Sequence, residues 1–371
     1  MGLKSLLLSS DEKTLRVLRR VLSDLEIEVE FCAQAEAAIR KITRQRFEAI
    51  IVDCDNAEDA GSVLRSAKAA PVNKRALSIA LVESPVGMRG GFDMGAHFVL
   101  HKPLSNERTK ASFRAVRALM KRERRLQMRV PVQVPVECHG SRRYQAKTLD
   151  LCEGGMAIQF SGRRAKESTL RFSLELPGLD QGLELYGEMA WEGNGDQAGV
   201  RFKNVTEAQR SILRQWLSNQ LPEPEQDDPP VSSSVTDLSP GGCYLKTNSP
   251  FPMGTRVVLS VKTDNLELRA GGIVRVAHAE FGMGVEFIQT TSEQQEQVQQ
   301  MLEHLRSNQD RVPDLQVAPE GLETSPAETE AASQASGTDD ALVDLFRQQS
   351  RVPVETFLQH MEQQRQALES A

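Results

Sequence analysis

The sequence predicts an α/β doubly wound parallel sheet followed by two small all-β barrels, each with a C-terminal helix. Three observations support this prediction. Residues 4–120 alternate five short apolar runs with helical segments, and neighbouring parallel strands need such crossovers. From residue 129 onward, short stretches of alternating apolar and polar residues are broken by Gly and Pro, as in small barrels. Short signatures from this second region then recur further along the chain.

The elements of the first domain follow from the periodicity of its apolar residues. Helices cover both faces of a doubly wound sheet, so its strands are apolar throughout, whereas its helices carry apolar residues on one side only. The expected strands are Lys4–Leu8, Glu28–Cys32, Ala49–Val52, Ala76–Val82 and His97–Leu100. The expected helices are Asp11–Leu25, Ala35–Arg46, Ala60–Ala69, a short stretch before the fifth strand, and Asn106–Arg125.

The second region contains two copies of one pattern. Six short strands are expected between residues 130 and 202, and a helix over 206–221 closes this first barrel. Its segment Asp150-Leu-Cys-Glu-Gly-Gly155 returns as Asp237-Leu-Ser-Pro-Gly-Gly242, and a second closing helix is expected over 293–305. Little sequence precedes Asp237, so the second copy is expected to lack its first strand.

The remaining segments are linkers and a C-terminal helical region. Residues 307–340 are acidic and rich in Pro, Ser, Thr and Ala, a composition that buries little and predicts disorder. Val354, Phe357, Leu358 and Met361 form one apolar stripe, which favours a helix docked on its own protein over the alternative of a partner-binding helix. The expected divisions are 1–120 (first domain), 121–221 (first barrel with its connector), 222–229 (acidic, proline-rich linker), 230–306 (second, truncated barrel), 307–340 (disordered linker) and 341–371 (amphipathic C-terminal helices).

Composition excludes several classes of protein. The net charge is −6, which argues against a protein that binds DNA over its whole surface. The longest apolar runs are far shorter than the roughly 18 residues of a membrane span, and no signal-peptide pattern opens the chain. A cytoplasmic protein without membrane insertion is therefore expected. The 5 cysteines include no C-x-x-C pair, so neither a zinc site nor a disulfide framework is expected, and no metal is predicted.

Two charged residues follow strands of the first domain. Asp53 ends the third expected strand, and Lys102 follows the fifth. Because the carboxyl ends of parallel strands converge on one crevice, these side chains can meet. Over residues 4–120 the chain resembles a response-regulator receiver domain. That resemblance implies that Asp53 is the phosphoacceptor position, that Lys102 pairs with it, and that an acidic pair after the first strand binds Mg²⁺.

The chain departs from the receiver pattern at the metal site. Ser9 and Ser10 stand where the acidic pair is expected, and Asp11 comes one step too late. Neutral hydroxyls lack the charge that offsets the dehydration of Mg²⁺. In receiver domains a Thr or Ser after the fourth strand senses the phosphate. Val82 stands at that position here and has no hydroxyl. We therefore expect a degenerate receiver that serves as an interaction module and is not phosphorylated. The alternatives are that Asp11 moves into register and that Asp53 is an ordinary surface carboxylate.

The first barrel carries a more specific signature. Arg125 and Arg129 are spaced R-x-x-x-R, and Asp150 follows 21 residues after Arg129. This order resembles a PilZ domain, the bacterial receptor for cyclic di-GMP, over residues 121–221. Guanidinium forks suit phosphate and the O6/N7 edge of guanine, and a carboxylate can accept from guanine N–H groups. The resemblance implies that cyclic di-GMP is bound by Arg125, Arg129, Asp150, Cys152, Gly154 and Gly155.

The two copies depart from the PilZ signature in different ways. Cys152 stands where the family has serine, and its weaker donor should cost about 1 kcal/mol of binding. The second copy retains Asp237, Ser239 and Gly242, yet no arginine pair precedes them, so we expect it not to bind. Arg210 and Arg214 precede Asp237 but fall inside the first closing helix, where a solvated face is expected.

These observations predict a bacterial cyclic di-GMP-binding signalling effector that is not an enzyme. The first barrel is expected to bind the dinucleotide and to rearrange relative to the unphosphorylated receiver-like domain. A protein partner would bind through the receiver-like domain, the second barrel or the C-terminal helix. The alternative is a nucleotide-independent scaffold of degenerate modules, favoured by Cys152. Phosphorelay output is disfavoured by Ser9 and Ser10.

Overall fold

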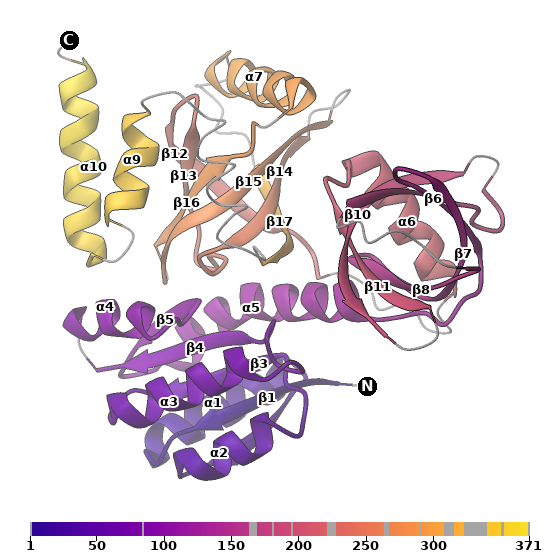
Figure 1. Cartoon of the computed structure of the whole chain (residues 1–371). Coiled ribbons are helices and arrows are strands. Elements are labelled where there is room, and N and C mark those ends of the chain that lie inside the picture. The colour runs from indigo at the N-terminus through magenta and orange to yellow at the C-terminus, as the bar shows by residue number, and fades with distance from the viewer. Residues whose placement is uncertain are drawn as a thin grey trace. The chain divides into compact units, whose positions relative to one another are not determined.

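The computed structural model divides the chain into two compact units, Met1–Glu123 with Asp227–Ala371, and Arg124–Gln226. Figure 1 shows the elements of both units. The residues that the structure describes are 2–83, 85–162, 169–179, 182–193, 196–220, 228–262, 267–279, 281–289, 291–307, 315–322, 340–349 and 352–369.

The first domain is a parallel sheet of five strands in the order β2-β1-β3-β4-β5, which confirms the predicted doubly wound fold. The strands are β1 (Leu3–Leu8), β2 (Ile27–Cys32), β3 (Ala49–Asp53), β4 (Leu77–Val82) and β5 (Phe98–His101). The helices are α1 (Glu12–Asp24), α2 (Ala35–Ile42), α3 (Ala57–Ala69), α4 (Pro85–Asp93) and α5 (Asn106–Gln127). Strands β3 and β4 are buried along their whole length, as expected for strands covered on both faces.

Side-chain caps set where the helices of this domain begin. Asn56 precedes α3, and its Oδ1 accepts from the backbone N–H groups of Glu58 and Asp59 at 3.1 and 3.2 Å. Both carboxylates lie in the first turn, where negative charge is stabilised by the helix dipole. The polar residue that follows β3 therefore turns the chain directly into the next crossover helix.

The first barrel is a closed sheet of six strands in the order β10-β11-β8-β7-β6-β9, with its own apolar core. Its helix α6 packs Leu213 and Trp216 into that core, and Trp216 Nε1 donates to the carbonyl of Pro177 at 2.9 Å. The elements are β6 (Pro135–His139), β7 (Arg143–Cys152), β8 (Gly155–Phe160), β9 (Thr169–Leu174), β10 (Leu183–Glu192), β11 (Gln197–Lys203) and α6 (Glu207–Gln220).

The second barrel is also a closed sheet of six strands, in the order β12-β13-β16-β15-β14-β17. The expected truncation is therefore wrong. Strand β17 lies antiparallel between β12 and β14, which is the position that β6 occupies between β7 and β9 in the first barrel. The elements are β12 (Val231–Leu238), β13 (Gly242–Lys246), β14 (Thr255–Lys262), β15 (Glu267–His278), β16 (Gly282–Phe287), α7 (Ser292–Ser307) and β17 (Leu315–Leu322).

Strand β17 also corrects the prediction that residues 307–340 are disordered. Leu315 and Val317 are buried in the barrel, whereas Gln316 and Ala318, which follow them, are half-buried. This alternation has the period of a strand, and the acidic composition around it concealed the signal. Residues 308–314 and 323–339 of that segment, and 222–227 of the other predicted linker, lie outside the described residues.

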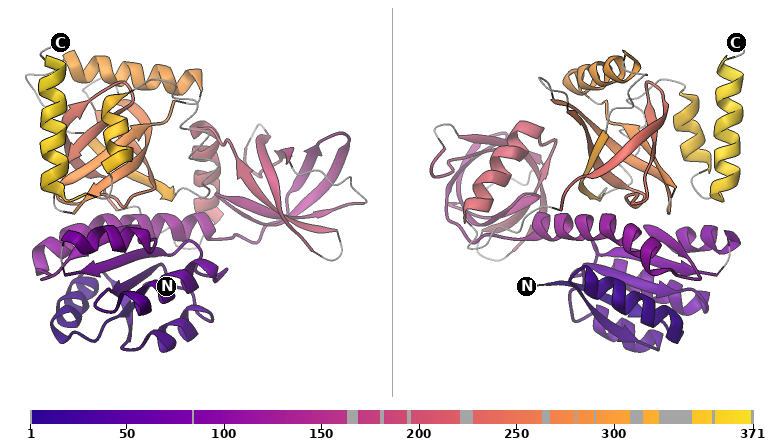
Figure 2. Two further views of the ribbon diagram at one scale, coloured as in Figure 1. Left: turned by 60° about the vertical axis from the view of Figure 1, so that its left-hand side comes forward. Right: turned by 180° about the vertical axis from the view of Figure 1, so that it is seen from behind.

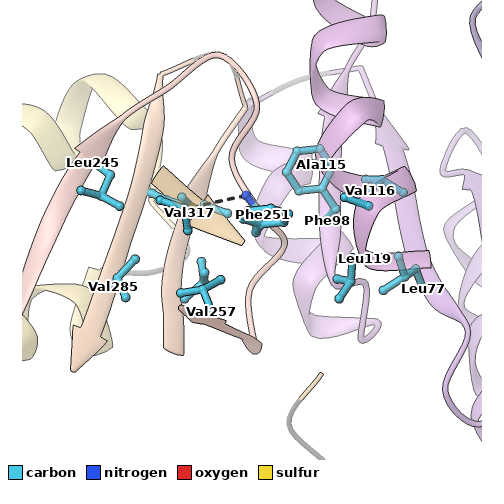
Figure 3. Packing of buried hydrophobic residues seen from close by; sticks show 14 of the residues in the cluster. Leu77, Phe98, Ala115, Val116, Leu119, Leu245, Phe251, Val257, Val285 and Val317 are labelled. Atoms are coloured by element: carbon cyan, nitrogen blue, oxygen red, sulfur yellow. Dashed lines mark hydrogen bonds between the residues drawn. The ribbon is translucent and has the colours of Figure 1, made fainter. Parts of the chain in front are cut away.

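The first domain and the second barrel share one apolar core (Figure 3). Phe251 from the loop after β13 is fully buried in the cluster that contains Phe98 of β5 and Leu119 of α5. Next to it, the backbone N–H of Met253 donates to the carbonyl of His97 at 3.2 Å. Helix α5 also contacts β17, because the buried Glu123 accepts from the backbone N–H of Leu322 at 2.5 Å. These two modules therefore form a single packed unit.

Two C-terminal helices, α9 (Ala341–Gln349) and α10 (Val354–Glu369), pack against the second barrel (Figure 2). Their buried side chains join Tyr244 of β13 and Val276 of β15 in a separate apolar cluster. Val354, Phe357 and Met361 of the predicted stripe are all buried, which confirms that the stripe docks on its own protein.

Candidate functional site

The predicted arginine pair lies on the segment that enters the first barrel. Arg125 is half-buried in the last turn of α5, and its carbonyl accepts from the N–H of Met128 at 3.0 Å. Two residues later, Val130 and Leu151 exchange backbone hydrogen bonds of 2.8 and 2.9 Å. This bridge fastens the entering segment to the end of β7, where Asp150 lies.

Arg129 and Asp150 are brought together by this arrangement. Arg129 Nη1 donates to Asp150 Oδ1 at 2.5 Å, and the same oxygen accepts from the N–H of Ala157 at 3.2 Å. The two side chains keep 42% and 27% of their surface exposed, so ligand can reach both charges from solvent. The Val130–Leu151 bridge fixes the backbone next to both side chains. A guanidinium and a carboxylate with complementary hydrogen-bonding edges therefore lie side by side.

Cys152 is the last residue of β7, and its side chain closes the turn into β8. Its thiol donates to the carbonyl of Gly155 at 3.2 Å, and burial raises the pKa of the thiol, which keeps it protonated. In the second barrel, Ser239 Oγ donates to the carbonyl of Gly242 at 3.1 Å in the corresponding turn. The thiol and the hydroxyl thus close the same turn, and Cys152 is buried rather than presented to solvent.

The two glycines of the first motif have different roles. A Cβ on Gly155 would lie 2.2 Å from the carbonyl oxygen of Val200, so this position must be glycine for β8 to approach β11. A Cβ on Gly154 would lie 3.4 Å from the carbonyl oxygen of Leu126 on the entering segment. Gly154 therefore keeps the motif close to the segment that carries the arginines, whereas Gly155 serves the barrel.

One contact at this site was missed by the reasoning from sequence. Arg214 of α6, expected on a solvated face, lies with its Nε 3.6 Å from the Oε2 of Glu153 in the motif turn. The Glu153 side chain is only 6% exposed. No local pattern connects these two residues, because 61 positions separate them; only the closure of the barrel by α6 brings them together.

The charged residues of the first domain meet as predicted. Lys102 Nζ donates to Asp53 Oδ1 at 2.8 Å and to Asp55 Oδ1 at 2.5 Å. Burial disfavours the ammonium, but these hydrogen bonds outweigh that cost and raise the pKa of Lys102. The other carboxylate oxygen of Asp53 accepts from Ser9 Oγ at 2.7 Å. Both oxygens of this buried carboxylate therefore have partners within the protein.

Asp11 does not take the place of the acidic pair of a receiver. It caps α1, accepting from the N–H groups of Lys13 and Thr14 at 3.1 Å and from Thr14 Oγ1 at 2.6 Å. The hydrogen bonds from Thr14 lower the pKa of this carboxyl. Because Ser9 faces Asp53 and Asp11 is held at the helix start, the residues present do not fit the Mg²⁺ site of a receiver.

The second motif forms the same turn as the first. Ser239 both donates to the carbonyl of Gly242 and accepts from its N–H at 3.1 Å, and Asp237 is paired with Tyr244 across β12 and β13. A Cβ on Gly242 would lie 2.5 Å from the carbonyl oxygen of Val285, which repeats the packing of Gly155. The motif is thus intact as a structural element. The segment packed against it contains Asp340 and Val343, whereas the segment packed against the first motif contains Leu126.

Comparison with known proteins identifies the two barrel regions. The model of the PilZ domain family matches residues 122–219 and 221–304. These regions are tandem PilZ domains. The second match ends before β17, the strand that closes its barrel. No curated protein matches the chain. Among the residues described, no helix combines the length and the apolar composition needed to cross a membrane.

Solved structures similar to parts of the chain include receiver domains and a PilZ domain. The receiver domain of a sensor histidine kinase from Pseudomonas aeruginosa PAO1 is 26% identical, with 30% of this chain and 93% of that chain covered and a TM-score of 0.28. A chemotaxis response regulator of Vibrio cholerae is 24% identical, with coverages of 29% and 92% and a TM-score of 0.26. The PilZ domain of CeSA from a cellulose-synthesizing bacterium is 23% identical, with coverages of 26% and 100% and a TM-score of 0.22.

Proposed function

We propose that the chain is a bacterial cyclic di-GMP-binding signalling effector whose first PilZ domain binds the dinucleotide. The observation that carries this proposal is the pairing of Arg129 with Asp150 at 2.5 Å, on a segment that the Val130–Leu151 bridge fastens to the barrel. The resemblance to PilZ receptors, which bind cyclic di-GMP, supplies the ligand.

The chemistry of the pair suits this ligand. Arg129 and Arg125 can donate to a phosphate edge or to guanine O6 and N7, and Asp150 can accept from the N–H edge of guanine. The ion pair between Arg129 and Asp150 is partly exposed, and such pairs contribute only about 0–1 kcal/mol. A phosphate can therefore replace or share the partner of Arg129 at little cost.

Calorimetric titration of cyclic di-GMP into the full chain tests this proposal. One charge-assisted hydrogen bond contributes about 1.5–3 kcal/mol, so Arg129→Ala should weaken binding by about 10- to 150-fold. Arg143→Ala is the matched control, because Arg143 is exposed at the opposite end of the strand that carries Asp150. No heat at high ligand, or equal affinity for the two variants, would contradict the proposal.

Ligand binding should also rearrange the first barrel relative to the receiver-like domain. Arg125 belongs to the last turn of α5, a helix that begins in the receiver-like domain. A ligand changes a conformational equilibrium only through its different affinity for the two states, and two arginines supply a few kcal/mol, about a hundredfold change in ratio. Because the receiver-like domain shares a core with the second barrel, these two should move together.

Hydrogen exchange with and without ligand measures this rearrangement. Protection is expected over residues 121–130 and 148–156, with no change over residues 237–242, where the second motif lies. Unchanged exchange in the first of these segments would remove the conformational part of the proposal. Equal protection at the second motif would instead indicate a ligand shared between the barrels.

In the proposed mechanism the receiver-like domain is an unphosphorylated interaction module. The contact of Asp53 with Ser9 supports this role, because a neutral hydroxyl lies beside the carboxylate where a receiver has its Mg²⁺-binding acidic pair. Without a metal ion, the charge of a transferred phosphoryl group would not be neutralised. The protein would then act by binding partners rather than by catalysis.

A nucleotide-independent scaffold is the second candidate function. The replacement of the family's serine by Cys152 favours it, since a thiol is a weaker hydrogen-bond donor than a hydroxyl. The same calorimetric titration distinguishes the two functions, because a scaffold would release no heat with the dinucleotide at any concentration.

A further inference from the structure

The second PilZ motif is in direct contact with the C-terminal helix α9. Asp340 precedes this helix, and its Oδ2 accepts from the backbone N–H of Gly241 at 2.7 Å. Its Oδ1 accepts from the N–H groups of Leu342 and Val343 at 3.1 and 3.2 Å. One buried carboxylate thus caps α9 and binds the motif turn at the same time.

Equivalent glycines of the two motifs show that α9 replaces the entering segment. The carbonyls of Gly154 and Gly241 accept from the N–H groups of Phe202 and Phe287 at 3.0 and 2.8 Å, so the two glycines occupy the same place in their barrels. A Cβ on Gly154 would face the carbonyl of Leu126 on the arginine segment. A Cβ on Gly241 would instead lie 2.8 Å from Asp340 and from Val343.

An aromatic anchor extends this contact along the barrel. Phe346 of α9 is fully buried, and a Cβ on Gly284 would lie 2.9 Å from its ring. The ring also packs with Tyr244 and with Phe357 of α10, at centroid distances of 6.4 and 6.2 Å. At the equivalent position of the first barrel, Gly199 lies under its own Trp191, which is 44% exposed.

A buried ionic contact completes the interface. Glu286 of β16 is only 4% exposed in its side chain and accepts from Arg347 of α9 and, at 2.6 Å, from Arg275 of β15. Two guanidiniums on one carboxylate offset the cost of burying its charge. The helical segment therefore presents a carboxylate, Asp340, an aromatic ring, Phe346, and a guanidinium, Arg347. Each of these groups has its own partner on the barrel.

We propose that the motif face of the second PilZ domain is a helix-binding site, and that its ligand is the chain's own α9–α10 segment bound within the same molecule. The face that carries the dinucleotide motif in the first barrel would here bind polypeptide. This inference rests on the proposed function only in assigning the dinucleotide to the first barrel. Nucleotide binding by the second barrel is not expected even when the helices are released, because no arginine pair precedes its motif.

Cleavage of the connection between barrel and helices tests this site. A protease recognition sequence placed within residues 323–339 of the full chain allows the C-terminal fragment to be cut from the folded protein. We expect the fragment to co-elute with the rest of the chain in gel filtration. A labelled synthetic peptide of residues 338–371 should replace the cleaved fragment on the rest of the chain. Titration of this peptide gives its affinity for the second barrel.

Matched variants show whether recognition is specific. Asp340→Ala should weaken retention of the fragment by about 10- to 150-fold, because it removes a charge-assisted hydrogen bond to Gly241. Asp344→Ala is the control, since Asp344 lies exposed on the same helix. Circular dichroism of each cleaved variant confirms that the barrels remain folded. Equal retention in both variants, or a fragment that elutes alone from the wild-type chain, would overturn the proposal.

Two further outcomes bear on the proposal independently of the first barrel. If the intact chain is a dimer in solution and Asp340→Ala makes it a monomer, the helices bind to a second copy of the chain. That result would overturn binding within one molecule. Release of the fragment could create a further binding event for cyclic di-GMP in calorimetry. If that event persists in Arg129→Ala, it would show that α9 covers a nucleotide site. If the intact chain binds no dinucleotide at all, the proposed function fails while the retention experiment keeps its meaning.

Discussion

Replacing Phe251 should destabilise two modules that are far apart in the sequence. This side chain belongs to the second barrel's polypeptide, yet it is fully buried in the core that also contains Phe98 and Leu119 of the receiver-like domain (Figure 3). Truncating a fully buried phenylalanine to alanine removes apolar contacts and leaves a cavity, at a cost of about 3–5 kcal/mol. Because the core is shared, Phe251→Ala should weaken both modules together.

Calorimetry and hydrogen exchange measure this effect. For a unit of this size, each kcal/mol lowers Tm by about 2–4 °C, so the transition of the unit should fall by roughly 6–20 °C. Amides of β5 and α5 should lose protection along with those of the second barrel. Phe172→Ala is the matched control, since Phe172 is fully buried in the separate core of the first barrel and should affect only that barrel.

The reasoning would be refuted by a local response to Phe251→Ala. If only amides of the second barrel lose protection while β5 and α5 keep theirs, the receiver-like domain does not depend on the shared core. A variant in which the first barrel also loses protection would show coupling between the two units that their separate cores do not predict.

Three other predictions concern single residues. Cys152→Ser should leave the affinity for cyclic di-GMP equal or improved in calorimetry, because Ser239 closes the corresponding turn with the same hydrogen bond; a large loss would show that the thiol itself contacts ligand. Incubation with Mg²⁺ and acetyl phosphate should add no phosphoryl group by intact-mass measurement, and an added group that disappears in Asp53→Asn would contradict the proposed role of the first domain. Burial lowers the pKa of His97 from 6.5 to about 4, and its Nδ1 accepts from the N–H of Ser78 at 2.9 Å, so the neutral ring is the stable folded form. Below pH 6.5 the unfolded state binds a proton on this imidazole that the folded state does not bind. The contribution of His97 to the free energy of unfolding is therefore complete above pH 6.5, and the free energy of unfolding falls by up to about 3 kcal/mol as the pH drops to 4. Urea unfolding at several pH values should show this fall, and His97→Gln should flatten it.

Local periodicity predicted most of the fold. The fully apolar β3 and β4 indicated a covered parallel sheet, and the recurrence of the Asp150–Gly155 segment at Asp237–Gly242 indicated the two barrels. The meeting of Asp53 with Lys102 was also predictable, because the ends of parallel strands converge. In each case the signal lies within one element or follows from sheet topology.

Contacts set by tertiary packing were not predictable in the same way. Strand β17 has a strand-like alternation, but only the unfilled place between β12 and β14 makes that segment a strand. Similarly, the contact of Arg214 with Glu153 and that of Asp340 with Gly241 join residues with no shared local pattern. Cys152 was expected to face ligand, whereas its burial follows from how β7 turns into β8.

The late position of β17 has a consequence for how the protein is made. All the strands and the helix of the first barrel have been synthesised once residue 220 is added, so this barrel can close while the rest of the chain is still being made. The second barrel has no partner for the open edges of β12 and β14 until residue 322 has been added. Unpaired edges of this kind recruit strands from other chains. A fragment ended at residue 304, where the family match stops, would carry these two edges permanently and should aggregate.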